Sequence, residues 1–230
     1  MKKSFIRISS LLLCFLLFVI FLCIAPGFDE HQFSFSTYMG DYIWNYQMIQ
    51  KVHNGYLPYS EINIIVTPLF HLIGSLFMNI FGTNFLVYDI YGAIIATIIT
   101  ALSYMITRTL VKSEKVSCVT TFLIAFLVLW TYTPNYNYLF MLIALMATLI
   151  EILKNTEKYK FKNHYLIIGI LLGLGFWAKQ NLGLVFGFGY FIYILLTENK
   201  RIVSLLKIGL RSHFIIDSIF NVFITKQYFL

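Results

Sequence analysis

The segment INIIVTPLFHLIGSLFMNIF, residues 62–81, decides how this chain is arranged. It is long enough to cross a bilayer, since about 20 helical residues span a hydrocarbon core of about 30 Å. It also carries polar or helix-breaking residues, namely Asn63, Pro68, His71, Ser75 and Asn79. Whether this segment crosses the membrane determines the side on which every later loop lies.

The composition is typical of a membrane protein. Of the 230 residues, 59% are hydrophobic and 12% are charged, whereas soluble domains carry about 25% charged residues. A soluble globule of this size could not bury so much apolar surface. The net charge of +7 comes from short basic clusters between apolar runs, which indicates topology and not nucleic-acid binding. The cysteines, Cys14, Cys23 and Cys118, lie in apolar stretches, so we expect buried hydrophobes and neither disulfides nor metal ligands.

Apolar runs predict the membrane helices. The first run, residues 8–25, follows a basic start and is longer than the roughly 7–15 residues of a cleaved signal peptide. An uncleaved anchor is therefore favoured over a cleaved signal. The remaining runs cover residues 62–81, 85–106, 116–132, 136–152, 165–178 and 182–196. The last two are short, and they are either parts of longer tilted helices or a re-entrant pair.

The positive-inside rule then indicates which runs cross. If every run crosses and the N-terminus is cytoplasmic, the basic clusters at residues 108–115, 154–162 and 200–201 all lie outside. If residues 62–81 do not cross, all of these clusters become cytoplasmic. We therefore predict that residues 62–81 form an interfacial helix on the outer surface. The charged residues of the resulting external segment, 26–84, are Asp29, Glu30, Asp41 and Glu61 against Lys51 alone.

The predicted fold is all-α, a polytopic transmembrane helix bundle with external juxtamembrane helices, in a cell membrane and with a cytoplasmic N-terminus. Residues 1–230 form a single membrane domain. Residues 1–25 are its first transmembrane helix, and residues 26–84 are an external loop with juxtamembrane helices. Residues 85–197 are further transmembrane helices, and residues 198–230 are a cytoplasmic amphipathic or truncated tail.

Acidic residues in or near the later spans are few. Asp89 lies about one turn inside the outer end of its span, and both an interfacial position and a catalytic role are open for it. Glu151 and Asp217 lie near cytoplasmic boundaries, where we expect them to be solvated. Two small-residue motifs would let helices approach closely, namely Gly169-x-x-x-Gly173 and Gly183-x-x-x-Gly187.

The external segment contains a second helical pattern over residues 41–53. Asn54-Gly55 breaks this pattern, and Pro58 then fixes an extended or turn geometry. Asp41 heads this pattern. An aspartate in that position serves as an N-cap, and a carboxylate beside the membrane could also be a base or a metal ligand.

The order of these motifs resembles the GT-C glycosyltransferases, in particular bacterial members of family 39, which are related to dolichyl-phosphate-mannose protein mannosyltransferases. The pattern is an acid, a helix of about fourteen residues, Gly-x-Leu-Pro-Tyr-x-acid, a spaced Pro-Leu and a Phe-Gly ending. The matching residues are Asp41, Gly55, Leu57, Pro58, Tyr59, Glu61, Pro68, Leu69, Phe81 and Gly82. Two later motifs extend the likeness over residues 1 to about 197, namely Pro134-Asn-Tyr-Asn137 and Gly173-Leu-Gly-Phe-Trp-Ala-Lys-Gln-Asn-Leu-Gly183.

The resemblance implies transfer of a sugar from a polyprenyl-phosphate carrier to an undefined acceptor on the outer face. Asp41 would be the catalytic base or a metal-linked acid, with the pair Asp29 and Glu30 as the alternative acid. Glu61 and Tyr59 would contact substrate. The likeness assigns no definite cofactor and leaves a divalent metal open, with Asp41 and Glu61 as its candidate ligands. Lys179 could pair with the carrier phosphate or extend to the interface as a snorkelling side chain.

Members of this family are usually about twice as long as this chain, so a truncated, inactive form is one expectation. The family often has Asp-Glu together, where this chain has Asp41-Tyr42. A small transporter or flippase-like protein and a non-catalytic membrane subunit are the alternatives to a transferase. Transporters place polar groups near mid-membrane, whereas the acids of this chain gather outside, which favours the transferase.

Overall fold

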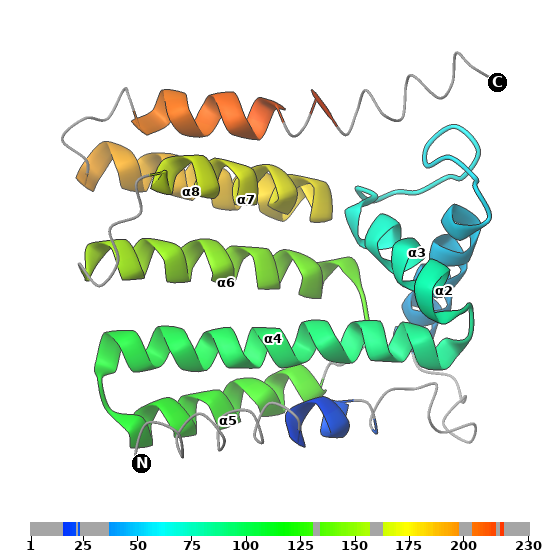
Figure 1. The fold of residues 1–230 in the computed structure, drawn as a ribbon, viewed down its shortest axis with the longest axis horizontal. Helices are drawn as coiled ribbons and strands as arrows, with labels where there is room; N and C mark the ends of the chain where they lie inside the picture. The colour runs from blue at the N-terminus through cyan, green and yellow to red at the C-terminus, as the bar shows by residue number, and fades with distance from the viewer. Residues whose placement is uncertain are drawn as a thin grey trace.

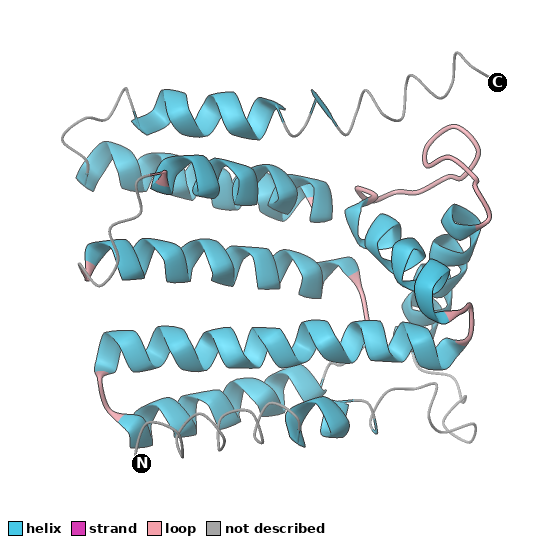
Figure 2. Cartoon of the chain, in the orientation of Figure 1, coloured by secondary structure: helices cyan, strands magenta, loops and turns pink. Residues whose placement is uncertain are grey.

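The computed structural model describes residues 16–21, 23, 37–130, 134–156, 163–197, 204–214 and 217–218. These residues are helical apart from short connecting loops (Figure 2), and their only β-type pairing is an isolated bridge between Pro58 and Ile62. The long helices lie side by side with nearly parallel axes (Figure 1). The prediction of an all-α helix bundle is confirmed.

The bundle contains both antiparallel and parallel neighbouring helices (Figure 1). Its helices are α4 (Phe85–Val111), α5 (Glu114–Trp130), α6 (Tyr136–Asn155), α7 (His164–Ala178) and α8 (Gln180–Thr197). Helix α4 contacts α5 and α6, α6 contacts α7, and α7 contacts α8. A further helical segment, residues 204–214, lies alongside α7 and α8.

Three of the described helices, α4, α6 and α8, are long and apolar enough to cross a membrane. The 27 residues of α4 correspond to about 40 Å of helix. Large apolar side chains face outward on the neighbouring helices, for example Phe122 and Leu127 on α5 and Val185 on α8, which are 71%, 64% and 71% exposed. An outer surface of this kind is what a bilayer covers.

Two further helices, α2 (Thr37–His53) and α3 (Leu69–Phe81), pack on each other at one end of the bundle (Figure 1). The prediction of one helix over residues 62–81 is wrong in its first third. Helix α3 begins only after Pro68, because Ile62 and Ile64 turn back to pack on Met48 of α2. The 13 residues of α3 give about 20 Å, less than the membrane core. That α3 does not cross stays a prediction, and its length supports it.

Two of the predicted glycines allow close helix packing. A Cβ on Gly169 would lie 2.8 Å from the carbonyl oxygen of Ile208, so the 204–214 segment approaches α7 there. A Cβ on Gly183 would lie 2.5 Å from Cα of Phe176, at the contact between α7 and α8. Gly187 has nothing within 4 Å and makes no such contact.

The cysteines differ in part from the prediction. Cys23 and Cys118 are free, and both are exposed. The expectation that they are buried is wrong for these two, because their side chains lie on the surface of the bundle and not between helices. Cys14 lies outside the described residues.

Glu151 contradicts the prediction that it is solvated, since it is only 7% exposed. Its carboxylate accepts hydrogen bonds from Tyr190 and, at 3.1 Å, from Tyr193, and it lies 2.7 Å from Nε2 of His164. The Lys154 ammonium is 3.6 Å away. These partners come from α6, α7 and α8, so the carboxylate joins three helices at the end of the bundle opposite α2 and α3. Asp217, in contrast, is exposed as predicted.

Candidate functional site

The candidate site lies where α2 and α3 meet the first residues of α4 and α6. Tyr42 of α2 and Asp89 of α4 are both fully buried, and the Tyr42 hydroxyl donates to Oδ1 of Asp89 at 2.8 Å. This bond ties α2 to α4. It also gives a structural reason for the tyrosine that follows Asp41 in this chain.

A second buried pair ties α2 to α3. The Asn45 amide donates from Nδ2 to the carbonyl oxygen of Asp41 at 2.7 Å, and its Oδ1 lies 3.1 Å from Nε2 of His71. Because Nδ2 is used by Asp41, Oδ1 is the atom that faces His71, so His71 Nε2 carries a proton and donates. Burial lowers the pKa of His71 to about 4, so its imidazole is neutral at pH 7.

Aromatic packing completes the attachment of α2. The Tyr46 ring stacks on Phe85 with centroids 3.9 Å apart, and its hydroxyl donates to the Thr83 carbonyl. Asn84 caps α4 by accepting from the Val87 N–H at 2.9 Å. Helix α2 is therefore held in one position against the start of α4, and the backbone of its exposed residues is held with it.

Asp41 is one of those exposed residues. Helix α2 begins at Thr37, four residues before Asp41. The prediction that Asp41 heads the helix is therefore wrong, and so is the N-cap interpretation, because Asp41 lies in the second turn. Its carboxylate is within electrostatic reach of Tyr136, the first residue of α6.

Lys179 reaches the same place from another part of the chain. It separates α7 from α8, and its ammonium donates to Oδ1 of Asn137 while lying 5.1 Å from the centroid of the Tyr136 ring. Asn135 caps α6 by accepting from the Asn137 N–H at 2.9 Å, which fixes the position of Asn137. The two later motifs of the sequence thus meet, and Tyr136 in the first of them is within electrostatic reach of Asp41.

Glu61 and Tyr59 lie elsewhere, in the loop beyond the C-terminal end of α2. The Glu61 carboxylate accepts from the Leu57 N–H at 2.6 Å, so it closes its own turn. Tyr59 has a φ of 70° and donates to the Val66 carbonyl at 3.2 Å. The twelve residues of α2 that follow Asp41 correspond to roughly 18 Å of helix.

The structure therefore does not bring Asp41 and Glu61 together. Within the part of the chain that it describes, no group of three or more His, Cys, Asp or Glu side chains could hold a metal ion. Asp29 and Glu30 lie outside the described residues. Tyr136 and Asn137 were not expected at the site, although they belong to the motif Pro134-Asn-Tyr-Asn137. Their contact with Lys179 depends on packing and has no local signal in the sequence.

These observations define a polytopic membrane protein with an acid and an ammonium gathered at one end of its bundle. The family model described as dolichyl-phosphate-mannose-protein mannosyltransferase matches residues 66–222, more than half of the chain, and the chain belongs to this family. It is a membrane glycosyltransferase of the GT-C type. The match includes Asn137 and Lys179 and begins after Asp41 and Glu61. No curated protein and no solved structure matches the chain.

Proposed function

We propose that this chain transfers a sugar from a polyprenyl-phosphate carrier to an acceptor at the outer face of the membrane. The observation that carries the proposal is the contact of Lys179 with Asn137 and Tyr136 at one end of the bundle, with the exposed Asp41 carboxylate within electrostatic reach of Tyr136. A carrier of this kind keeps its isoprenoid chain in the bilayer and its phosphate at the interface. The site has a base and a cation at that depth.

The chemistry divides between the two charged residues. Asp41 takes the proton of the acceptor hydroxyl as that oxygen attacks the anomeric carbon of the sugar. The bond between the anomeric carbon and the phosphate oxygen breaks, and the carrier phosphate leaves with the electron pair. Lys179 donates to that phosphate and stabilises its growing negative charge. Asn137 and the Tyr136 ring hold the ammonium in place.

The remaining candidate residues have subordinate roles in this proposal. Glu61 and Tyr59, beyond the far end of α2, contact a part of the substrate distant from the reacting bond. Asp29 and Glu30 are the alternative acids. Asp41 and Glu61 are too far apart to share a metal ion, so the proposed mechanism uses none.

The orientation follows from charge. Arg108 and Lys112 lie at the end of α4, and Lys154 lies at the end of α6; these helix ends are opposite α2 and α3 (Figure 1). The positive-inside rule then assigns the basic end and the N-terminus to the cytoplasm. The external loop, residues 26–84, lies on the donor side together with the site.

The test is transfer of a radiolabelled hexose from a polyprenyl-phosphate donor in membranes. Asp41→Asn keeps the size of the side chain and removes the base, so kcat is expected to fall by about 10²–10⁴. Lys179→Gln removes a charged hydrogen bond worth about 1.5–3 kcal/mol in the transition state, so kcat/KM for the donor is expected to fall by roughly 10- to 100-fold. Lys51→Gln, an exposed charge change elsewhere on α2, is the control and should leave both constants unchanged.

Undiminished turnover by Asp41→Asn would refute its role and point to Asp29 or Glu30. A wild-type chain that inserts and folds but transfers no sugar would contradict the transferase proposal and favour a transporter or a non-catalytic subunit.

A further inference from the structure

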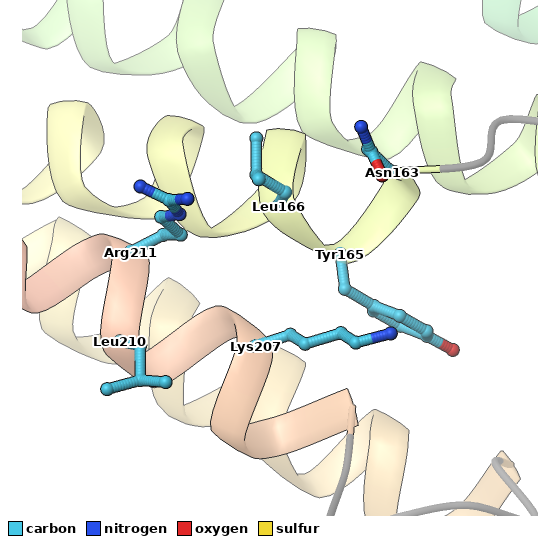
Figure 3. A pocket seen from close by; sticks show the side chains of 6 residues that line it. All are labelled: Asn163, Tyr165, Leu166, Lys207, Leu210 and Arg211. Carbon is cyan, nitrogen blue, oxygen red and sulfur yellow. The ribbon is translucent and has the colours of Figure 1, made fainter.

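A basic pocket lies at the end of the bundle opposite the candidate site. It opens between the start of α7 and the 204–214 segment and has a cavity volume of about 260 Å³. Figure 3 shows its lining, which consists of Asn163, Tyr165, Leu166, Lys207, Leu210 and Arg211. The pocket is separate from the proposed transfer site, and no step of the proposed reaction uses it.

Two cations line this pocket from one face of the 204–214 segment. Lys207 and Arg211 are four residues apart, a spacing that places helical side chains on the same side. In Figure 3 the Lys207 side chain extends toward Tyr165. Among the residues that the structure describes, no acidic side chain lines the pocket, and neither Lys207 nor Arg211 forms an ion pair.

A third cation supports the wall of the pocket. The Lys154 ammonium donates to the Tyr165 hydroxyl at 2.8 Å and lies 4.6 Å from the centroid of its ring. The nearby acid, Glu151, is already engaged by His164, Lys154 and two tyrosines within the bundle. The negative charge of Glu151 is therefore compensated within the bundle. The positive charge of Lys207 and Arg211 is available to a ligand.

The surroundings of the pocket are those of a lipid headgroup. Helix α7 is apolar after its first two residues, His164 and Tyr165, and Leu210, beside the two cations, is 70% exposed. The pocket lies where α7 begins, at the end of the bundle that the charge pattern assigns to the membrane boundary. The pocket thus combines the Lys207 and Arg211 cations and the Asn163 amide with an apolar wall.

We propose that this pocket binds the phosphate of an anionic phospholipid, from the leaflet opposite the candidate transfer site. The ammonium of Lys207 and the guanidinium of Arg211 extend in different directions in Figure 3 and turn toward the phosphate to donate to its oxygens when the lipid binds. The acyl chains lie along the exposed leucines of the 204–214 segment, Leu206 and Leu210. Basic pockets between membrane helices on the cytoplasmic side are suited to such headgroups. The bound lipid links the 204–214 segment to α7, next to the close approach at Gly169.

The proposal is tested by titrating the purified full chain with phosphatidylglycerol or phosphatidylcholine and counting bound lipids by native mass spectrometry. The chain is expected to bind phosphatidylglycerol roughly tenfold more tightly, or better, because two charge-assisted hydrogen bonds form only with an accessible anionic headgroup. The double variant Lys207→Gln/Arg211→Gln should lose this preference. The control Lys112→Gln/Lys115→Gln has the same change in charge at exposed positions on the same end of the bundle, and it should keep the preference.

A second variant guards against a folding defect in the first. Leu210→Trp fills the mouth of the pocket and leaves both cations in place, and it too should lose phosphatidylglycerol. Equal losses in the pocket and control double variants would overturn the proposal, because the preference would then belong to the whole basic surface. Glycerol phosphate that competes as strongly as the lipid would also overturn it, in favour of a soluble phosphate ligand.

Discussion

Replacing Gly183 by alanine is expected to push α8 away from α7. The new Cβ would lie 2.5 Å from Cα of Phe176, 2.6 Å from its N and 2.9 Å from the carbonyl carbon of Gly175. Carbon atoms pack at about 3.5–4.0 Å, so the overlap is about 1 Å. The atoms that are met belong to the backbone of α7, so no side-chain rotation relieves the overlap.

An added methyl group in such a contact typically costs about 1–3 kcal/mol of stability. Gly189→Ala is the matched control, because a Cβ at that position of the same helix meets nothing within 4 Å. The assay is the free energy of unfolding from titration of mixed micelles with dodecyl sulfate. The Gly183 N–H donates to the Lys179 carbonyl at 2.8 Å, so sugar transfer should also fall in Gly183→Ala. Equal free energies of unfolding for the two variants would refute the packing on which this reasoning rests.

Three further predictions concern buried bonds and topology. Tyr42→Phe is expected to lower the free energy of unfolding by about 1–3 kcal/mol, because it removes a donor from the buried Asp89 carboxylate; an unchanged value in the same titration would contradict this. Glu151→Ala is expected to lower the free energy of unfolding by about 3 kcal/mol, because the buried groups that surround the carboxylate lose their partner. A melting temperature equal to that of the wild type would contradict a stabilising role of Glu151 and its partners. In a cysteine-free background, a cysteine at Ser60 should react with an impermeant thiol reagent outside intact cells and one at Ser113 should not; the reverse pattern would overturn the orientation.

The membrane helices could be predicted from the sequence because their signal is local. The runs 85–106 and 136–152 begin where α4 and α6 begin. Both helices continue beyond their apolar runs, since helical hydrogen bonding persists through polar residues at the interface. Helix α4 ends only where Lys112 adopts a left-handed conformation, with a φ of 57°.

The structural features that were not predicted depend on tertiary contacts, for which the sequence has no local signal. Glu151 was expected to be solvated because it lies near the end of an apolar run. Its partners Tyr190 and Tyr193 come about forty residues later, and only the parallel packing of α8 beside α6, after the chain has turned back through α7, brings them to it (Figure 1). Similarly, the residues before Leu69 are apolar enough for a helix, and they form a loop because Ile62 and Ile64 pack on α2.

The candidate site was predicted in part for the same reason. Asp41 and Lys179 could be identified singly as a carboxylate and an ammonium near the outer boundary. Their meeting through Tyr136 and Asn137 requires the first residues of α6 to lie between α2 and the end of α7. Asp41 and Glu61 are not brought together, because Asp41 lies in the second turn of α2 and Glu61 lies in the loop beyond its C-terminal end.

The way in which α2 is held explains how an exposed carboxylate can have a defined position. Asp41 precedes the buried Tyr42, and its own carbonyl accepts from the buried Asn45. Buried polar groups are costly unless they are paired, so the bonds of Tyr42 to Asp89 and of Asn45 to His71 each permit one docking of α2 against the bundle. The backbone of Asp41 is fixed by these bonds, although its side chain is in solvent. A base positioned in this way needs little reorganisation before it accepts a proton, and the buried pairs beneath it therefore contribute to the transfer reaction that we propose.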